Sequence, residues 1–137
     1  MHRAAATLVF ALINSGAAAE WVRVGGNNNV GVYADPASLS KKGHLATMVD
    51  LLNFSSAQTE RSSGRLPYRS QKETREYDCT NERYRLTRFS LRADFMFGGA
   101  LVRSNAADGE WNPVQPASLG EALWKFACGK KLREATP

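Results

Sequence analysis

The chain has 137 residues, with 18 Lys and Arg against 13 Asp and Glu and a formal net charge of +5. This length suits a single domain. The positive excess is too small to indicate nucleic-acid binding by itself, and after the N-terminal segment no stretch is long and apolar enough to predict a membrane-spanning helix.

The N-terminal segment has the layout of a secretory signal peptide, with an ordinary helix as the alternative. Arg3 supplies the positive start, residues 4–13 are apolar, and the alanines at 17–19 provide small residues for cleavage before Glu20. No cysteine lies near this cleavage site, so we expect export to the periplasm or the extracellular space without a lipid anchor. The expected boundaries are 1–19 for the signal peptide, 20–129 for the domain and 130–137 for a flexible tail.

Three strands are predicted in the first half of the domain. Residues 20–24 and 30–35 have strand character and flank the glycine- and asparagine-rich turn 25–29, which predicts a hairpin. A turn or a single helical turn is expected at 35–38. Residues 44–54 are apolar on both faces, which favours a central strand over the alternative of a helix.

The second half of the domain continues with strands and connections. Residues 55–67 contain almost nothing apolar and predict a long, mobile loop. Residues 68–79 and 84–93 predict two strands, and the second requires a bulge near Thr87-Arg88 because its apolar residues change face. Two further strand pairings are predicted, at 100–104 and 111–114.

A helix with well-defined ends is predicted near the C-terminus. Ser118 is the expected N-cap and Glu121 completes the capping-box pattern. Gly129 is the expected end of the helix. The apolar stripe expected to dock this helix consists of Leu119, Ala122, Leu123 and Phe126.

The chain has two cysteines, Cys79 and Cys128. In an exported chain a pair of cysteines favours a disulfide, with two buried free thiols as the alternative. The bond would tie the end of the helix to the middle of the sheet and would stabilise the fold by about 4 kcal/mol.

Several short pieces, taken in order along the chain, resemble the surface-adhesin protein E family of secreted bacterial proteins. The most specific are Tyr77-Asp78-Cys79, the stretch 111–118 and the final Cys128. The resemblance implies an α+β fold, in which a single antiparallel sheet of about six strands carries a C-terminal helix fastened by one disulfide. It also implies a protein that binds host matrix components.

The clearest candidate binding surface is basic. Cations recur along two predicted neighbouring strands, and the guanidinium fork of arginine suits sulfate and phosphate. Carboxylates such as Glu76 and Asp78 interleave with the cations, so cross-strand ion pairs on a solvated face are the alternative. The candidate patch comprises Arg69, Lys72, Arg75, Arg85, Arg88 and Arg92.

The sequence indicates no enzyme, metal site or cofactor. His44 is the only histidine after the signal segment, and no spacing selects an aspartate and a serine to form a triad with it. Gly25-Gly26 lacks the Gly-Lys pair of a phosphate-binding loop. With the disulfide formed, no thiolate remains for zinc.

We therefore expect a secreted, non-enzymatic binding module of the bacterial envelope with no nucleic-acid partner. Its partner would be an extracellular matrix or envelope protein, or a polyanion, bound through sheet and loop surface. An exposed strand edge could also pair with a second copy to form a homodimer. The alternative function is a periplasmic structural or stress-related envelope protein with no host ligand.

Overall fold

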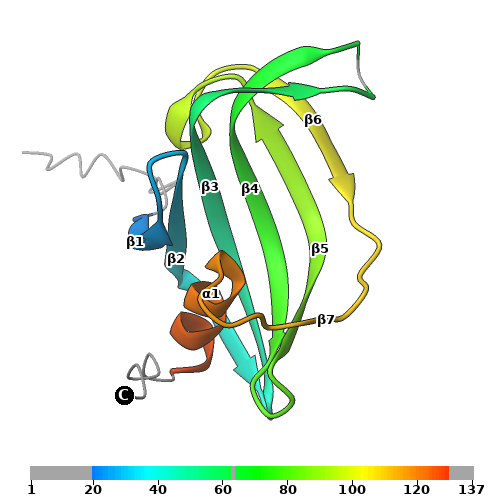
Figure 1. The fold of residues 1–137 in the computed structure, drawn as a ribbon. Coiled ribbons are helices and arrows are strands. Elements are labelled where there is room, and N and C mark those ends of the chain that lie inside the picture. Colours follow the sequence, from blue (N-terminus) through cyan, green and yellow to red (C-terminus); the bar gives the residue numbers. More distant parts are fainter. Residues whose placement is uncertain (1–19, 63, 130–137) are drawn as a thin grey trace, which may run out of the picture.

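The computed structural model describes residues 20–62 and 64–129, which form one antiparallel sheet and a C-terminal helix (Figure 1). The predicted fold class is confirmed. The signal peptide expected at 1–19 and the tail expected at 130–137 lie outside the described residues. In the described part of the chain, no helix is long and apolar enough to span a membrane.

The strands follow one another in the sheet in the same order as in the sequence, β1-β2-β3-β4-β5-β6. All neighbours are antiparallel, as expected where consecutive strands are joined by hairpins. A short strand, β7 (Asn112–Pro113), pairs with the free half of β5, as predicted for 111–114. The main strands are β1 (Val22–Gly26), β2 (Val30–Lys42), β3 (Leu45–Glu60), β4 (Leu66–Asp78), β5 (Arg83–Arg92) and β6 (Leu101–Ala106).

The turn predicted at 35–38 is wrong, because β2 continues through it. The register between β2 and β3 shifts between Asp35 and Ser40, which accommodates Pro36 within the strand. The Ser38 hydroxyl donates to the Asp35 carbonyl over 2.7 Å and accepts the Val49 N–H over 2.8 Å. This side chain therefore bridges the gap in the backbone ladder.

The long loop predicted at 55–67 is also wrong. Strand β3 extends to Glu60 and β4 begins at Leu66, so most of the segment is a hairpin that projects from one end of the sheet (Figure 1). The hydrogen bonds between paired strands are made by backbone groups. Polar side chains are therefore compatible with a strand where both faces of the sheet are open to water. Composition alone therefore does not separate this hairpin from a loop.

The predicted bulge in β5 is confirmed. Thr74 is opposite Arg88 and Arg75 is opposite Leu86, so Thr87 is the additional residue. Its hydroxyl donates to the Thr74 carbonyl over 3.1 Å. The bulge lets Leu86 and Phe89 face the same side of the sheet although they are three residues apart.

Helix α1 (Leu119–Cys128) packs on one face of the sheet, with the predicted caps in place. The Ser118 hydroxyl accepts the Glu121 N–H over 3.1 Å, and Gly129 adopts φ 66°. The docking residues differ in part from the predicted stripe, because Trp124 is only 5% exposed whereas Phe126 is half-buried. The core beneath the helix consists of Val32, Ala34, Ala46, Met48, Tyr77, Leu123, Trp124, Ala127 and Cys128.

The predicted disulfide between Cys79 and Cys128 is confirmed, with a Cα–Cα distance of 5.5 Å. Because alternate strand residues face opposite sides of a sheet, Tyr77 lies under the helix while its neighbour Asp78 faces the other side. The face opposite the helix is called the uncovered face below.

Candidate functional site

A depression of about 270 Å³ lies on the uncovered face between β4 and β5. Lys72 is opposite Ser90 and Thr74 is opposite Arg88, so these four side chains point to the same side of the sheet. The remaining lining comes from Val49 and Phe89, so two cations and two hydroxyls surround the depression without a carboxylate. We call Lys72, Thr74, Arg88 and Ser90 the basic depression.

Both cations of the basic depression keep hydrogen-bonding capacity. Arg88 is exposed and has no carboxylate partner among the described residues. The Lys72 ammonium lies 4.3 Å from the centroid of the Phe97 ring, a contact that positions the charge without using its N–H groups. A lysine, an arginine and two hydroxyls at this spacing can bind a sulfate, phosphate or carboxylate group.

The structure places Arg75 apart from the other cations of the predicted patch. Its Nε lies 3.0 Å from Asp50 Oδ2 and donates to Glu73 Oε2 over 2.7 Å on the face covered by the helix. The inclusion of Arg75 in the patch does not fit this position. The physical reason is the two-residue period of a strand, which separates Arg75 from Lys72 and Thr74.

Arg69 and Arg92 lie beside the connection between β5 and β6. The Arg69 guanidinium is 4.8 Å from the Phe95 ring centroid, and the Arg92 guanidinium is 4.6 Å from that of Phe97. Arg92 also donates to the Gly99 carbonyl over 2.8 Å. These contacts hold both cations at one end of the sheet, where they extend the charge of the basic depression.

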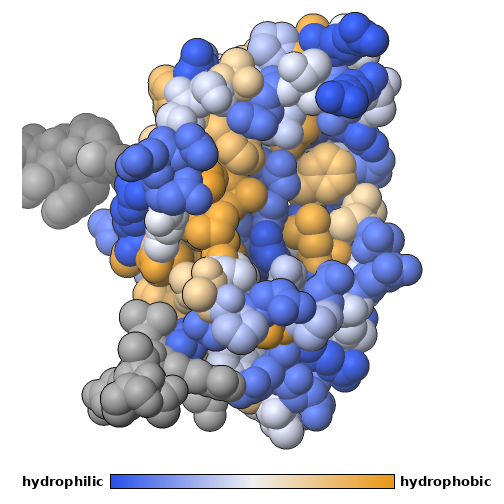
Figure 2. Space-filling model, in the orientation of Figure 1, coloured by the Kyte–Doolittle hydropathy of each residue, from blue (hydrophilic) through white to orange (hydrophobic). Residues whose placement is uncertain are grey.

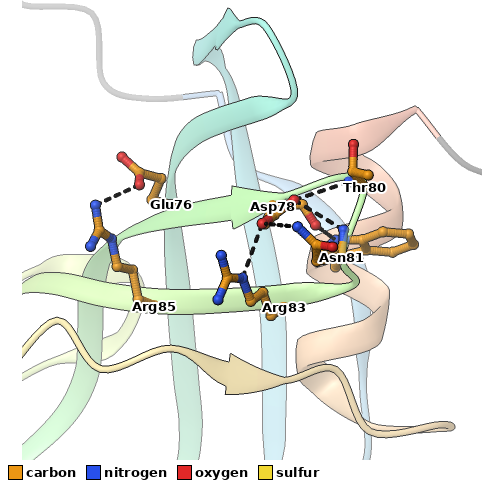
Figure 3. A network of polar contacts seen from close by, with 7 residues as sticks. Glu76, Asp78, Thr80, Asn81, Arg83 and Arg85 are labelled. Carbon is orange, nitrogen blue, oxygen red and sulfur yellow. Dashed lines mark hydrogen bonds and ion pairs between the residues drawn. The ribbon is translucent and has the colours of Figure 1, made fainter.

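Arg85 lies at the other end of β5, where it forms a cross-strand ion pair of the kind that the alternative describes. Arg85 donates to Glu76 over 2.7 Å, and Arg83 donates to Asp78 over 3.0 Å (Figure 3). Burial alone would raise the pKa of Asp78. Hydrogen bonds from Asn81 and Arg83, among others, outweigh it and hold that pKa below its ordinary value.

Trp111 completes this region, and the sequence reasoning did not find its role. The guanidinium groups of Arg83 and Arg85 each lie 4.5 Å from the centroid of its ring. Trp111 precedes β7, whose pairing with β5 brings it beside these arginines. A local pattern could not reveal this contact, because it depends on a pairing between distant segments.

A second polar cluster lies on the helix-covered face. Asp50, Glu73 and Arg75 occupy neighbouring positions across β3 and β4, and the Tyr77 hydroxyl donates to Asp50 Oδ2 over 3.5 Å. Figure 2 shows this side, where a hydrophilic floor lies between apolar surfaces above α1. Burial and the neighbouring Glu73 carboxylate raise the pKa of Asp50 despite the attraction of Arg75.

The Asp50 carboxylate in this cluster is closed to solvent. Asp50 is fully buried and its Oδ1 has no hydrogen-bond partner among the described residues, while Arg75 occupies the space beside its Oδ2. The described residues contain no group of three or more side chains suited to hold a metal ion. His44, the histidine considered for catalysis, is exposed in the connection between β2 and β3.

Comparison with known proteins identifies the family. The family model described as surface-adhesin protein E matches residues 21–129. The chain belongs to the surface-adhesin protein E family. The resemblance noted in the sequence is thereby confirmed, and a search of curated proteins found no match.

Solved structures of protein E from Haemophilus influenzae are similar to this chain in fold. Crystal form II of that protein E has a TM-score of 0.62 at 15% identity, covering 80% of this chain and 87% of that one. Its selenomethionine form has a TM-score of 0.63 at 14% identity, covering 82% and 88%. At these identities the likeness shows a common fold.

Proposed function

We propose that this protein is a secreted, non-enzymatic binding module of the bacterial envelope that binds a sulfated or phosphorylated polyanion through its uncovered face. The observation that carries the proposal is the basic depression, in which Lys72 and Arg88 flank a site free of carboxylates. Membership of a surface-adhesin family supports a role in binding outside the cytoplasm. Export would depend on the signal peptide predicted at 1–19.

The arrangement of the remaining cations favours a repeating ligand over a single small anion. Arg85, Arg88 and Arg92 follow one another along β5, and at a rise of about 3.3 Å per residue they span roughly 20 Å. A polymer with regularly spaced anionic groups can contact several of these cations at once. Arg85 is the weakest contributor, because Glu76 already neutralises much of its charge.

Heparin serves as the probe for this proposal. We expect the secreted chain to be retained on immobilised heparin and released by salt, because exposed charge pairs are screened by ions. The double variant Lys72→Gln/Arg88→Gln should bind about tenfold more weakly, since it removes two charge-assisted contacts.

A matched control separates a specific site from overall charge. The variant Arg23→Gln/Lys41→Gln removes the same amount of charge from exposed positions outside the basic depression. It should elute with the wild type. Equal weakening by both variants would mean that heparin binding depends on the net charge of the protein and not on the basic depression. Failure to bind heparin or matrix protein would favour the structural or stress-related alternative.

The export part of the proposal has its own test. Mass spectrometry of the protein from fractionated cells should find a mature chain that begins at Glu20 in the periplasmic or extracellular fraction. A full-length chain in the cytoplasmic fraction would contradict it.

A further inference from the structure

The connection between β5 and β6, residues 93–100, exposes apolar side chains together with the first residue of β6. Phe95, Met96 and Leu101 are 48%, 40% and 55% exposed. Only two other large hydrophobic residues of the described chain are comparably exposed, Val22 and Leu66. Single exposed apolar residues are ordinary, but a cluster on one connection indicates an interaction surface.

The connection is held in place from below. The buried Ser70 hydroxyl donates to the Asp94 carbonyl over 2.6 Å and accepts the Phe97 N–H over 2.9 Å. Asn53 Oδ1 accepts the Met96 N–H over 2.8 Å. Two polar side chains, from β3 and β4, therefore determine the path of the connection.

The path includes two strained residues. Met96 and Phe97 have φ values of 53° and 63°, in the left-handed region that side chains other than glycine seldom adopt. Such strain persists only where the surroundings impose it, and it is common at functional sites. Here Ser70 and Asn53 impose the conformation in which Phe95 and Met96 remain in solvent.

Three cations lie beside the aromatic rings of this connection. Arg69 lies over the Phe95 ring, and Lys72 and Arg92 lie over the Phe97 ring, at 4.8, 4.3 and 4.6 Å from the respective centroids. The connection itself carries one carboxylate, that of Asp94. The connection lies at the end of the sheet remote from α1 (Figure 1), so neither the helix nor the disulfide obstructs it.

We propose that the 93–101 segment docks the protein onto an anionic phospholipid surface. Phe95 and Met96 enter the boundary between head groups and acyl chains, where burial of apolar side chains is favourable. Arg69, Lys72 and Arg92 contact the lipid phosphates. The three cations favour a membrane as the partner, because a broad anionic surface can contact all of them at once. A purely apolar partner would bury Phe95 and Met96 but would leave these cations without anionic groups.

Co-sedimentation of the secreted chain with vesicles tests the proposal. We expect binding to vesicles that contain phosphatidylglycerol and much weaker binding to pure phosphatidylcholine. The variant Phe95→Ser/Met96→Ser should bind at least about tenfold more weakly. The variant Arg69→Gln/Arg92→Gln should bind about 25-fold more weakly, since each cation contributes roughly fivefold near an anionic surface.

Control variants distinguish this surface from general hydrophobicity and charge. Val22→Ser/Leu66→Ser removes the other exposed apolar pair, and Arg23→Gln/Lys41→Gln removes two cations from elsewhere. Both should bind vesicles like the wild type. Phe95→Ser/Met96→Ser should keep its retention on heparin, because neither residue lines the basic depression, so the two proposals can fail separately.

The proposal is overturned if the wild type binds both kinds of vesicle equally or neither, or if Phe95→Ser/Met96→Ser binds like the wild type. Sedimentation velocity adds a further outcome. If that variant abolishes self-association and leaves vesicle binding unchanged, the partner is a second copy of this chain and the membrane proposal is wrong. Unchanged thermal unfolding would show that the substitutions at these exposed positions leave the fold intact.

Discussion

Trp124 donates its indole N–H to the backbone carbonyl of Asp78 over 2.9 Å. The next residue of the chain, Cys79, lies in the turn after β4 and is bonded to Cys128, one helical turn further along α1. The helix is therefore attached at two successive residues of the chain, once by a hydrogen bond to the last residue of β4 and once covalently to the turn. Both attachments act at the end of β4, opposite to the end that carries the exposed β5–β6 connection.

We expect Trp124→Phe to lower the free energy of unfolding by about 1–3 kcal/mol, because the Asp78 carbonyl would lose its partner in a buried environment. Urea unfolding measures this change. Trp111→Phe provides the comparison, since Trp111 is half-buried and contacts arginines on the uncovered face. Trp111→Phe should lower the free energy of unfolding by less than about 1 kcal/mol. Equal losses would mean that the indole hydrogen bond contributes nothing measurable.

Gly120→Ala should destabilise the protein, although the same change in a helix ordinarily adds about 1 kcal/mol. A Cβ at this position would lie 2.9 Å from Cε1 of Tyr84, so the ring or the helix would have to move. We expect a loss of about 1–3 kcal/mol from overpacking. Thermal unfolding measures it, and combining the change with Tyr84→Leu should recover part of the loss. A more stable Gly120→Ala variant would contradict the close packing of helix and ring.

The network around Asp78 should make stability depend on acid. The pKa of Asp78 is held below its ordinary value, so its contribution is present above about pH 4 and is lost as the pH falls through the folded-state pKa. Asp78→Asn should therefore be less stable than the wild type at neutral pH, and the two should converge in strong acid. Urea midpoints at about pH 3 and pH 7 test this. A stability difference between the wild type and Asp78→Asn that is the same at both pH values would mean that the charge of Asp78 does not contribute to it.

Asp50 should act in the opposite direction. Its pKa is raised in the folded state, so its contribution is favourable at low pH and is lost as the pH rises from about 4 towards the raised value. Asp50→Asn keeps the shape but removes the titration. Relative to the wild type, it should therefore gain stability as the pH rises from about 4 to 8. A relative stability that stays constant over this range would mean that Arg75 keeps the Asp50 carboxylate ionised in the folded protein.

Local signals predicted much of the fold correctly. The cap at Ser118, the bulge at Thr87 and the helix end at Gly129 each depend on backbone needs of a few adjacent residues. The hairpin at 55–67 was missed because its polar strands carry no alternating pattern. Trp124 is buried although it lies outside the predicted apolar stripe, because a helical stripe does not show how far a sheet curves around the helix.

The sequence by itself determined the order of the strands along the chain, the helix, the cysteine pair and the family, because these depend on short-range patterns and on residues of unusual chemistry. Only the tertiary structure decided which cations share a surface. The pleat sends Lys72 and Arg75 to opposite faces, and the position of α1 decides which of these faces stays open to solvent. The β5–β7 pairing brings Trp111 beside Arg83 and Arg85. These placements depend on contacts between distant segments, whose free energy is not encoded at any one position of the chain.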